Sequence, residues 1–109
     1  MSKQEPVTHV VIFKLDKNKF RPVHCAQLLA QMRGSIPGMI ALKFGPANTQ
    51  PFGDYTDRSQ GYTHVLVSKH VEPAALHHYQ DHPLHIALVK YLRSVTVDKP
   101  LAIDVTSHL

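Results

Sequence analysis

The segment that decides the fold is VTHVVIFKL, residues 7–15. Its side chains are apolar or β-branched at odd and at even positions, which is typical of a strand buried on both faces. Alternate residues share a face, so His9 lies with Phe13, whereas Val10 lies with Ile12 on the opposite side. A sheet that contains this strand must therefore be covered on both sides.

Helical and strand patterns alternate along the rest of the chain. Pro22, Pro73 and Pro83 each suit the first turn of a helix, and helical spacing of apolar residues follows. After the first strand, the expected elements are a helix at 23–33, strands at 39–44 and 62–68, helices at 73–79 and 83–93, and a strand at 101–106. Residues 45–60 have no period and are expected to form a long loop.

This order, β-α-β-β-α-α-β, predicts an α+β fold of the ferredoxin-like, split β-α-β kind. In that fold, helices lie on one face of a four-stranded antiparallel sheet. The helices leave a second apolar face, which is larger than a monomer normally exposes. We therefore expect a homodimer in which two sheets pack face to face as a dimeric α+β barrel. Residues 1–109 are expected to form a single domain with its core at 7–107.

The composition excludes several classes of protein. One Cys in 109 residues rules out a disulfide framework and a zinc site made of cysteines. No apolar run approaches the ~18 residues of a membrane span, and the first residues lack a signal peptide. We expect a cytoplasmic protein that has no membrane partner.

A small basic cluster lies at Lys14, Lys17, Lys19 and Arg21. It has no interleaved aromatic residues and no nucleic-acid-binding motif, so a solvated loop is the favoured interpretation. We expect no nucleic-acid partner.

Two of the nine histidines interrupt apolar strands. His9 lies in the first strand and His64 in the third, each among apolar neighbours. If both faces look toward the helices, the two imidazoles could line one cavity. The alternative for either residue alone is a core histidine whose ring bonds a backbone carbonyl.

A third histidine lies in the segment YQDHPLH, residues 79–85. His85 shares a helix face with apolar residues, so it should point inward, and Tyr79 closes the preceding helix. An inward imidazole beside a tyrosine hydroxyl is the pairing expected of a general base and its orienting partner. His82, just before Pro83, is better explained as a helix cap. The apolar walls of such a cavity are expected to be Phe13, Leu28, Leu88, Val89 and Leu92.

Metal binding is the weaker explanation for so many histidines. No His-Glu-x-x-His motif occurs, and the chain has only eight acidic residues. We expect no metal site, and the remaining histidines are interpreted as surface residues: His24, His70, His77, His78 and His108.

Five short motifs resemble, in order and spacing, the stress-responsive A/B barrel (Dabb) family. They are HVVIFK at 9–14, IPGM at 36–39, GYTH at 61–64, HPLH at 82–85 and the strand IDV at 103–105. The resemblance spans about residues 7–107. It implies a dimeric α+β barrel, but not a single function, because some members of the family are enzymes and others resemble non-catalytic stress proteins.

The resemblance extends to the pocket of a plant polyketide cyclase of this family. Its four polar residues fall on His9, His64, Tyr79 and His85, although residues 46–60 form a longer loop here. This implies a cofactor-free intramolecular aldol condensation of a small apolar or β-keto substrate, or a related C–C lyase reaction. His85 would be the base and Tyr79 would hold its tautomer, while His9 or His64 would bind the enolate. The alternative is a non-catalytic barrel with a ligand-binding or incidental pocket.

Overall fold

The computed structural model describes residues 5–106 and contains the seven expected elements in the expected order. They are β1 (Val7–Phe13), α1 (Pro22–Met32), β2 (Met39–Pro46), β3 (His64–His70), α2 (Pro73–Asp81), α3 (Pro83–Val95) and β4 (Leu101–Thr106). Each helix begins at a proline, as predicted. The main difference is at β3, which starts two residues later than expected and continues for two more, to His70.

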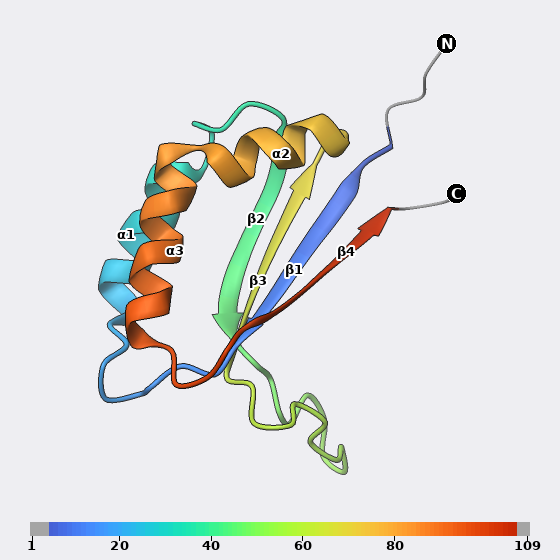
Figure 1. The fold of residues 1–109 in the computed structure, drawn as a ribbon. Coiled ribbons are helices and arrows are strands. Elements are labelled where there is room, and N and C mark those ends of the chain that lie inside the picture. Colours follow the sequence, from blue (N-terminus) through green and yellow to red (C-terminus); the bar gives the residue numbers. More distant parts are fainter. Residues whose placement is uncertain (1–4, 107–109) are drawn as a thin grey trace.

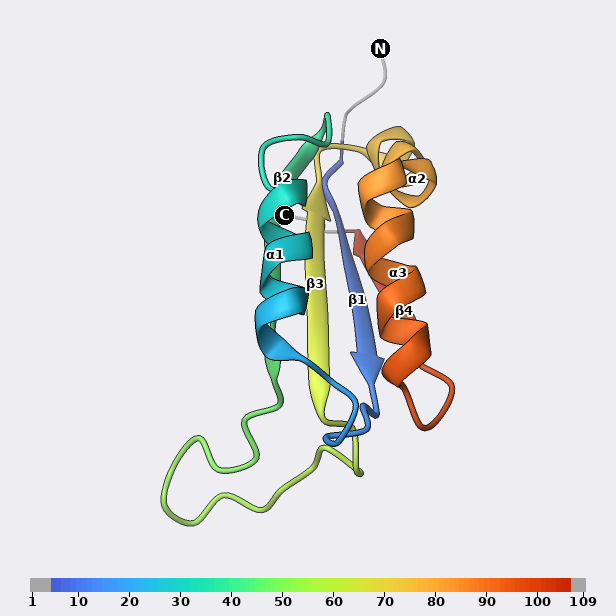
Figure 2. The ribbon, with the colours of Figure 1, turned by 90° about the vertical axis from the view of Figure 1, so that its left-hand side faces the viewer.

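The four strands form one antiparallel sheet in the order β2-β3-β1-β4. All three helices lie on the same face of this sheet, and the opposite face is open (Figure 1). Seen from the helical side, α1 and α3 run side by side along the strands, and α2 lies at one end (Figure 2). This arrangement confirms the predicted ferredoxin-like α+β fold.

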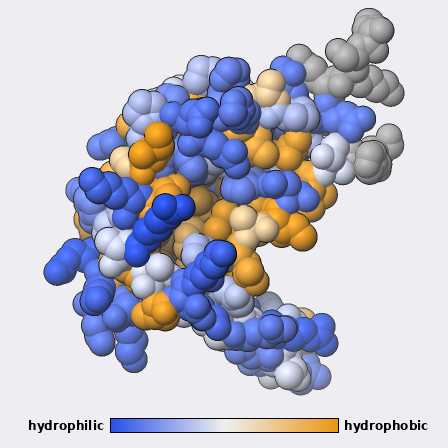
Figure 3. Space-filling model, viewed as in Figure 1, coloured by the Kyte–Doolittle hydropathy of each residue, from blue (hydrophilic) through white to orange (hydrophobic). Residues whose placement is uncertain are grey.

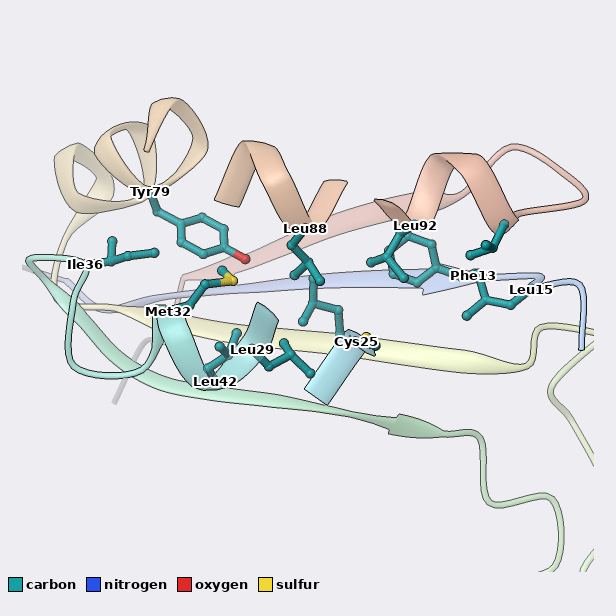
Figure 4. Packing of buried hydrophobic residues seen from close by; sticks show 12 residues of the cluster. Phe13, Leu15, Cys25, Leu29, Met32, Ile36, Leu42, Tyr79, Leu88 and Leu92 are labelled. Carbon is teal, nitrogen blue, oxygen red and sulfur yellow. The ribbon is translucent and has the colours of Figure 1, made fainter. Parts of the chain in front are cut away.

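The hydrophobic core fills the layer between the helices and the sheet (Figure 4). Leu88 and Leu92 of α3 are almost fully buried against Leu66 of β3, and Met32 of α1 closes the layer from the other helix. Burying side chains of this size contributes about 1.5–3 kcal/mol each. The core therefore holds α3 firmly on β1 and β3.

The strand register determines which polar side chains lie beneath the helices. His9 on β1 pairs with Ser68 on β3 and with Asp104 on β4, and Val7 pairs with His70. Because paired residues point to the same side of a sheet, all of these residues face the helices. The polar residues of the helical face thus gather where β1 begins and β3 ends, close to α2.

The open face of the sheet is apolar along β4. Leu101, Ile103 and Val105 are 55%, 67% and 51% exposed, and Val10 and Val67 continue this face on β1 and β3. None of the described helices is long and apolar enough to cross a membrane.

The turn before β2 fits closely against α2. Gly38 has a positive φ of 81°, and a Cβ added there would lie 2.6 Å from the Cβ of Ala75. The carbonyl of Gly38 also accepts a hydrogen bond of 2.9 Å from the backbone N–H of Val71. This contact fixes α2 against the start of β2.

Gly38→Ala should therefore destabilise the protein more than Gly34→Ala. Gly34 has a similar φ of 77° but has no atom within 4 Å of an added Cβ. Both changes incur the cost of a left-handed alanine, about 1–2 kcal/mol, and only Gly38→Ala adds an overpacking cost of about 1–3 kcal/mol. Urea unfolding of both variants measures the difference. Equal losses would show that the contact with Ala75 contributes nothing.

Candidate functional site

A cavity of about 680 Å³ opens between α3 and the inner face of the sheet at β1 and β3. This volume is within the ~300–1,000 Å³ range of sites for small organic molecules. Its walls combine apolar and polar side chains, namely His9, Val11, Phe13, Leu66, Gln80, His85, Ile86, Val89, Lys90, Leu92, Arg93 and Pro100. Apolar surface is visible between α3 and β4 (Figure 3).

His85 lies in the first turn of α3 and lines this cavity. Its Nδ1 lies 3.2 Å from the carbonyl oxygen of Gln80, which can only accept a hydrogen bond. Nδ1 therefore carries the proton and Nε2 keeps a free lone pair. Burial lowers the pKa of His85, and the backbone hydrogen bond of Gln80 opposes that decrease. The neutral imidazole is thus the form present near neutral pH.

His9 lines the same cavity from β1 and is held from the side of β4. Its Nδ1 forms a hydrogen bond with the carboxylate of Asp104, the neighbouring residue in the ladder. Since an ionised carboxylate is an acceptor, Nδ1 donates and Nε2 is the ring nitrogen left for a ligand. Asp104 therefore fixes the tautomer and the orientation of His9.

Tyr79 packs behind the two imidazoles but does not line the cavity. Its ring centroid lies 4.2 Å from that of His85 and 6.3 Å from that of His9. The side chain is fully buried, and its hydroxyl points into the core beside Met32 and Leu88 (Figure 4). Burial raises the pKa of Tyr79, and the Ser68 hydroxyl partly opposes this increase. Gln80, and not Tyr79, fixes the tautomer of His85.

His70 corrects one prediction, because it is fully buried and not a surface residue. It occupies the last position of β3, where its Nε2 lies 2.8 Å from the Ser68 hydroxyl and its ring lies 4.6 Å from Tyr79. Its Nδ1 and the Tyr79 hydroxyl are buried without a hydrogen-bond partner of good geometry among residues 5–106. Burial is the main cause that lowers the pKa of His70 to about 4, and the nearby His9 and His85 lower it further.

His64 is not brought together with the other three predicted site residues. It pairs with Phe13, whereas His9 pairs with Ser68, four residues further along β3 and thus roughly 13 Å away. Its ring stacks on Phe44 at 5.5 Å and contacts Phe20 at 4.8 Å. There it lines a separate, largely apolar cavity of about 350 Å³. Burial lowers the pKa of His64 as well.

The remaining candidates are distributed as follows. Phe13, Val89 and Leu92 lie in the wall of the larger cavity, but Leu88 belongs to the core and Leu28 packs against it. His82 caps α3, with its Nδ1 accepting a 3.1 Å hydrogen bond from the N–H of Leu84. His24, His77 and His78 are exposed, as expected, and His108 lies outside the described residues.

The sequence interpretation missed several polar groups of this site. Asp104 could have been found from the alternation of LAIDVT, residues 101–106, because its aspartate breaks an apolar strand. Ser68 and His70 are alternate residues of β3 and share its inner face with Leu66. The carbonyl of Gln80 carries no sequence signal, since any residue supplies one.

Neither the buried cysteine nor a cluster of metal-binding side chains adds a catalytic group to this site within residues 5–106. Cys25 is buried in α1, and burial raises the pKa of its thiol to about 11, so it is not a thiolate nucleophile. Among residues 5–106, no three His, Cys, Asp or Glu side chains form a group that could hold a metal ion. Residues 47–63, between β2 and β3, contribute nothing to the wall of the larger cavity.

The model of one protein family, the stress responsive A/B barrel domain, matches residues 7–107. Three solved structures illustrate the shared fold. A dimeric ferredoxin-like protein of unknown function from Thermobifida fusca has a TM-score of 0.74 at 18% identity, with 98% of this chain and 95% of that chain covered. A protein from Arabidopsis thaliana also has a TM-score of 0.74, at 24% identity and coverage of 94% and 96%. Hydroxynitrile lyase from Passiflora edulis has a TM-score of 0.73 at 18% identity, with coverage of 97% and 96%. No curated protein matches the sequence.

The buried His70 should make the stability of the protein depend on pH. Its pKa is about 4 in the folded chain, compared with the ordinary 6.5 of an unfolded chain. Between these values only the unfolded chain binds the proton, so the free energy of unfolding should fall as the pH falls from 6.5 to 4. The charged form would face His9 on β1 and His85 on α3, and only Asp104 on β4 would favour it.

His70→Phe should reduce this loss of stability by about 1–3 kcal/mol, because its buried ring takes up no proton. Urea unfolding at pH 7 and at pH 4.5 measures the effect. His78→Gln, at an exposed position of α2, is the matched control and should keep the dependence of the unmodified chain. The same dependence in His70→Phe would assign the proton uptake to other groups.

Proposed function

The chain belongs to the stress-responsive A/B barrel domain family, and on that premise we propose that it is a cofactor-independent enzyme acting on a small carbonyl compound. The observation that carries the proposal is the environment of His85. A neutral imidazole with its proton fixed on Nδ1 lines a largely apolar cavity beside a second, carboxylate-held imidazole. This is a suitable arrangement for removing a proton from carbon next to a carbonyl group.

In the proposed reaction, Nε2 of His85 takes the proton from a carbon flanked by two carbonyl groups. The electron pair of the C–H bond moves to the adjacent carbonyl oxygen and forms an enolate. Because the pKa of His85 is lowered by burial, its base form is available below neutral pH. His85, now an imidazolium, then donates this proton to the oxygen of the carbonyl group that has been attacked.

His9 is proposed to bind the enolate oxygen through Nε2–H in its protonated form. The other ring proton, on Nδ1, is accepted by the carboxylate of Asp104, which orients the ring. A donor aimed at the oxygen where charge develops lowers the barrier more than one that binds the ground state equally well.

Tyr79 is proposed as a positioning residue and not as a group that touches the substrate. Its ring packs on His85, while its hydroxyl lies in the core. The segment from Tyr79 to His85 includes the cap His82, so both side chains are fixed by the same helix junction.

The same base and cavity suit two reactions. Attack of the enolate carbon on a second carbonyl of the same chain forms a C–C bond and gives a polyketide cyclase-like aldol condensation. In the reverse reaction, His85 takes the proton of a β-hydroxyl group, the C–C bond breaks to give a carbonyl compound and an enolate, and the imidazolium returns the proton to the enolate carbon, which is a lyase reaction. The walls Phe13, Val89 and Leu92 would fold or hold an apolar chain for either reaction.

One observation favours a second candidate, a non-catalytic ligand-binding barrel. Nδ1 of His85 and Nδ1 of His9 are both bound to groups of the protein itself, the Gln80 carbonyl and Asp104. Histidines satisfied in this way also occur in pockets that only bind a ligand. The two candidates differ in whether His85 exchanges protons with carbon.

The open sheet face supports a homodimer of this chain. Three β4 residues, Leu101, Ile103 and Val105, are more than half exposed on it. The Thermobifida fusca relative with the same fold is a dimeric protein. Packing two such faces together would remove this apolar surface from water and close the barrel.

His85→Gln should abolish base catalysis while the fold is retained. Exchange of the acidic C–H protons of ethyl 3-oxooctanoate for deuterium, followed by proton NMR, measures the step without knowledge of the natural substrate. We expect catalysed exchange to fall about 10²- to 10⁴-fold in His85→Gln, the usual contribution of a general base. The control is His77→Gln, at an exposed histidine of α2. If His85→Gln catalyses exchange as fast as the unmodified chain, His85 is not the base, and the ligand-binding barrel is favoured.

Tyr79→Phe and Tyr79→Leu separate the ring from the hydroxyl. Tyr79→Phe keeps the ring on His85 and should retain most of the exchange activity. Its stability should be unchanged or raised by about 1 kcal/mol, because it removes a buried hydroxyl that has no hydrogen-bond partner of good geometry among residues 5–106. Tyr79→Leu should lower the exchange rate and shift its pH profile. If Tyr79→Phe alone abolishes exchange in a folded protein, the hydroxyl itself acts in the reaction.

Ile103→Glu should convert the dimer to a monomer, because it places a charge among the exposed apolar residues of β4 on the open sheet face. Sedimentation equilibrium at micromolar concentration measures the mass. Val23→Glu, at a residue of α1 that is 72% exposed, is the matched control and should remain dimeric. A monomeric unmodified chain at that concentration would refute the face-to-face dimer.

A further inference from the structure

The two ends of the larger cavity differ in charge. One end holds His85 and His9, whereas the other, along the second half of α3, holds Lys90 and Arg93 beside Pro100. Among residues 5–106, no acidic residue lines the cavity. Its far end is therefore positive at neutral pH.

Neither cation is neutralised by its neighbours. Within the part of the chain that the structure describes, Lys90 and Arg93 form no ion pair. Three of the aspartates are paired elsewhere: Asp98 lies 3.8 Å from Lys14, Asp81 lies 3.6 Å from His77, and Asp104 bonds His9. A ligand anion would thus meet two free cations.

The surface between the two ends is apolar. His85 and Arg93 are eight residues apart on α3, roughly 12 Å along the helix axis. Val89 and Leu92 lie between them on α3, and Phe13 lines the opposite wall from β1. A ligand that fills the cavity would therefore be elongated, apolar along its length and negative at one end.

We propose that the substrate is an acyl-chain anion whose head group, a carboxylate or a phosphate ester, binds Lys90 and Arg93. This inference rests on the proposed function, because it places the reactive carbonyl groups of the same molecule beside His85. Arg93 can bind a carboxylate or phosphate through two parallel N–H donors, and Lys90 adds a second positive charge. The head group fixes which carbons of the chain reach the imidazoles.

Calorimetric titration of the full chain with three ligands of equal chain length tests the proposal. The ligands are octanoate, octyl phosphate and octanamide, measured at low and at high sodium chloride concentration. At low salt, at least one anion should bind ten times more tightly than the neutral amide, and high salt should reduce that preference. The anion that binds more tightly, octanoate or octyl phosphate, identifies the head group.

The double variant Lys90→Gln/Arg93→Gln should lose the preference for the anion and bind octanamide as the unmodified chain does. The matched control is Lys17→Gln/Lys19→Gln, which removes the same charge from exposed residues before α1. Equal binding of anions and amide by the unmodified chain, or equal loss of preference in the control, would overturn the proposal.

His85→Gln separates this inference from the proposed function. It should keep the preference for the anion, because the head group binds at the other end of α3. Loss of deuterium exchange with the anion preference retained confirms both assignments. Anion preference with no catalysed exchange in any variant would reject the enzyme and leave the head-group site standing.

Discussion

The pairing of β1 with two antiparallel neighbours is the constraint on which the site depends. A shift of one residue in either ladder would turn its partner side chains to the open face. The observed register places His9 between Ser68 and Asp104, all beneath the helices. Residues from three strands, distant in sequence, meet in this way without contributing to the apolar core. Leu66, Leu88 and Leu92 then hold α3 over them, so the same packing that stabilises the fold also places His85.

Much of the fold could be predicted from VTHVVIFKL and from the three prolines that begin the helices, because strand parity and proline geometry are local properties. The inward positions of His9 and His85 are also local, since each follows from the period of its own element. The separation of His64 from His9 is not local. Both share the inner face of the sheet, but only the register between β1 and β3 shows that they are four residues apart along it. The burial of His70 was missed because Lys69 and His70 look like the polar end of a strand.

The electrostatics of the cavity follow from its histidines. His9, His70 and His85 surround the ring of Tyr79. Charge on His9 lowers the pKa of both His70 and His85, and charge on His85 lowers that of His70. Burial acts in the same direction on His70 and His85, and it is opposed by the Asp104 carboxylate at His70 and by the Gln80 backbone hydrogen bond at His85. Near neutral pH the cluster therefore offers at least one uncharged base, while permanent positive charge is confined to Lys90 and Arg93 at the other end of the cavity. This division lets one small cavity hold both a base and an anion.

The loop at residues 47–63 projects from the end of the sheet opposite α2 (Figure 1). It joins the end of β2 to the start of β3, whereas His70 lies at the opposite end of β3. The loop supplies no wall of the larger cavity. A change in its length alters only the entropy of closing a hairpin, which grows slowly with loop size. Evolution and protein engineering alike can therefore insert sequence there, including a recognition segment or a fused domain, without disturbing the ladder that aligns His9. An inserted recognition segment would therefore disturb the strand register and the larger cavity least at that end of the sheet.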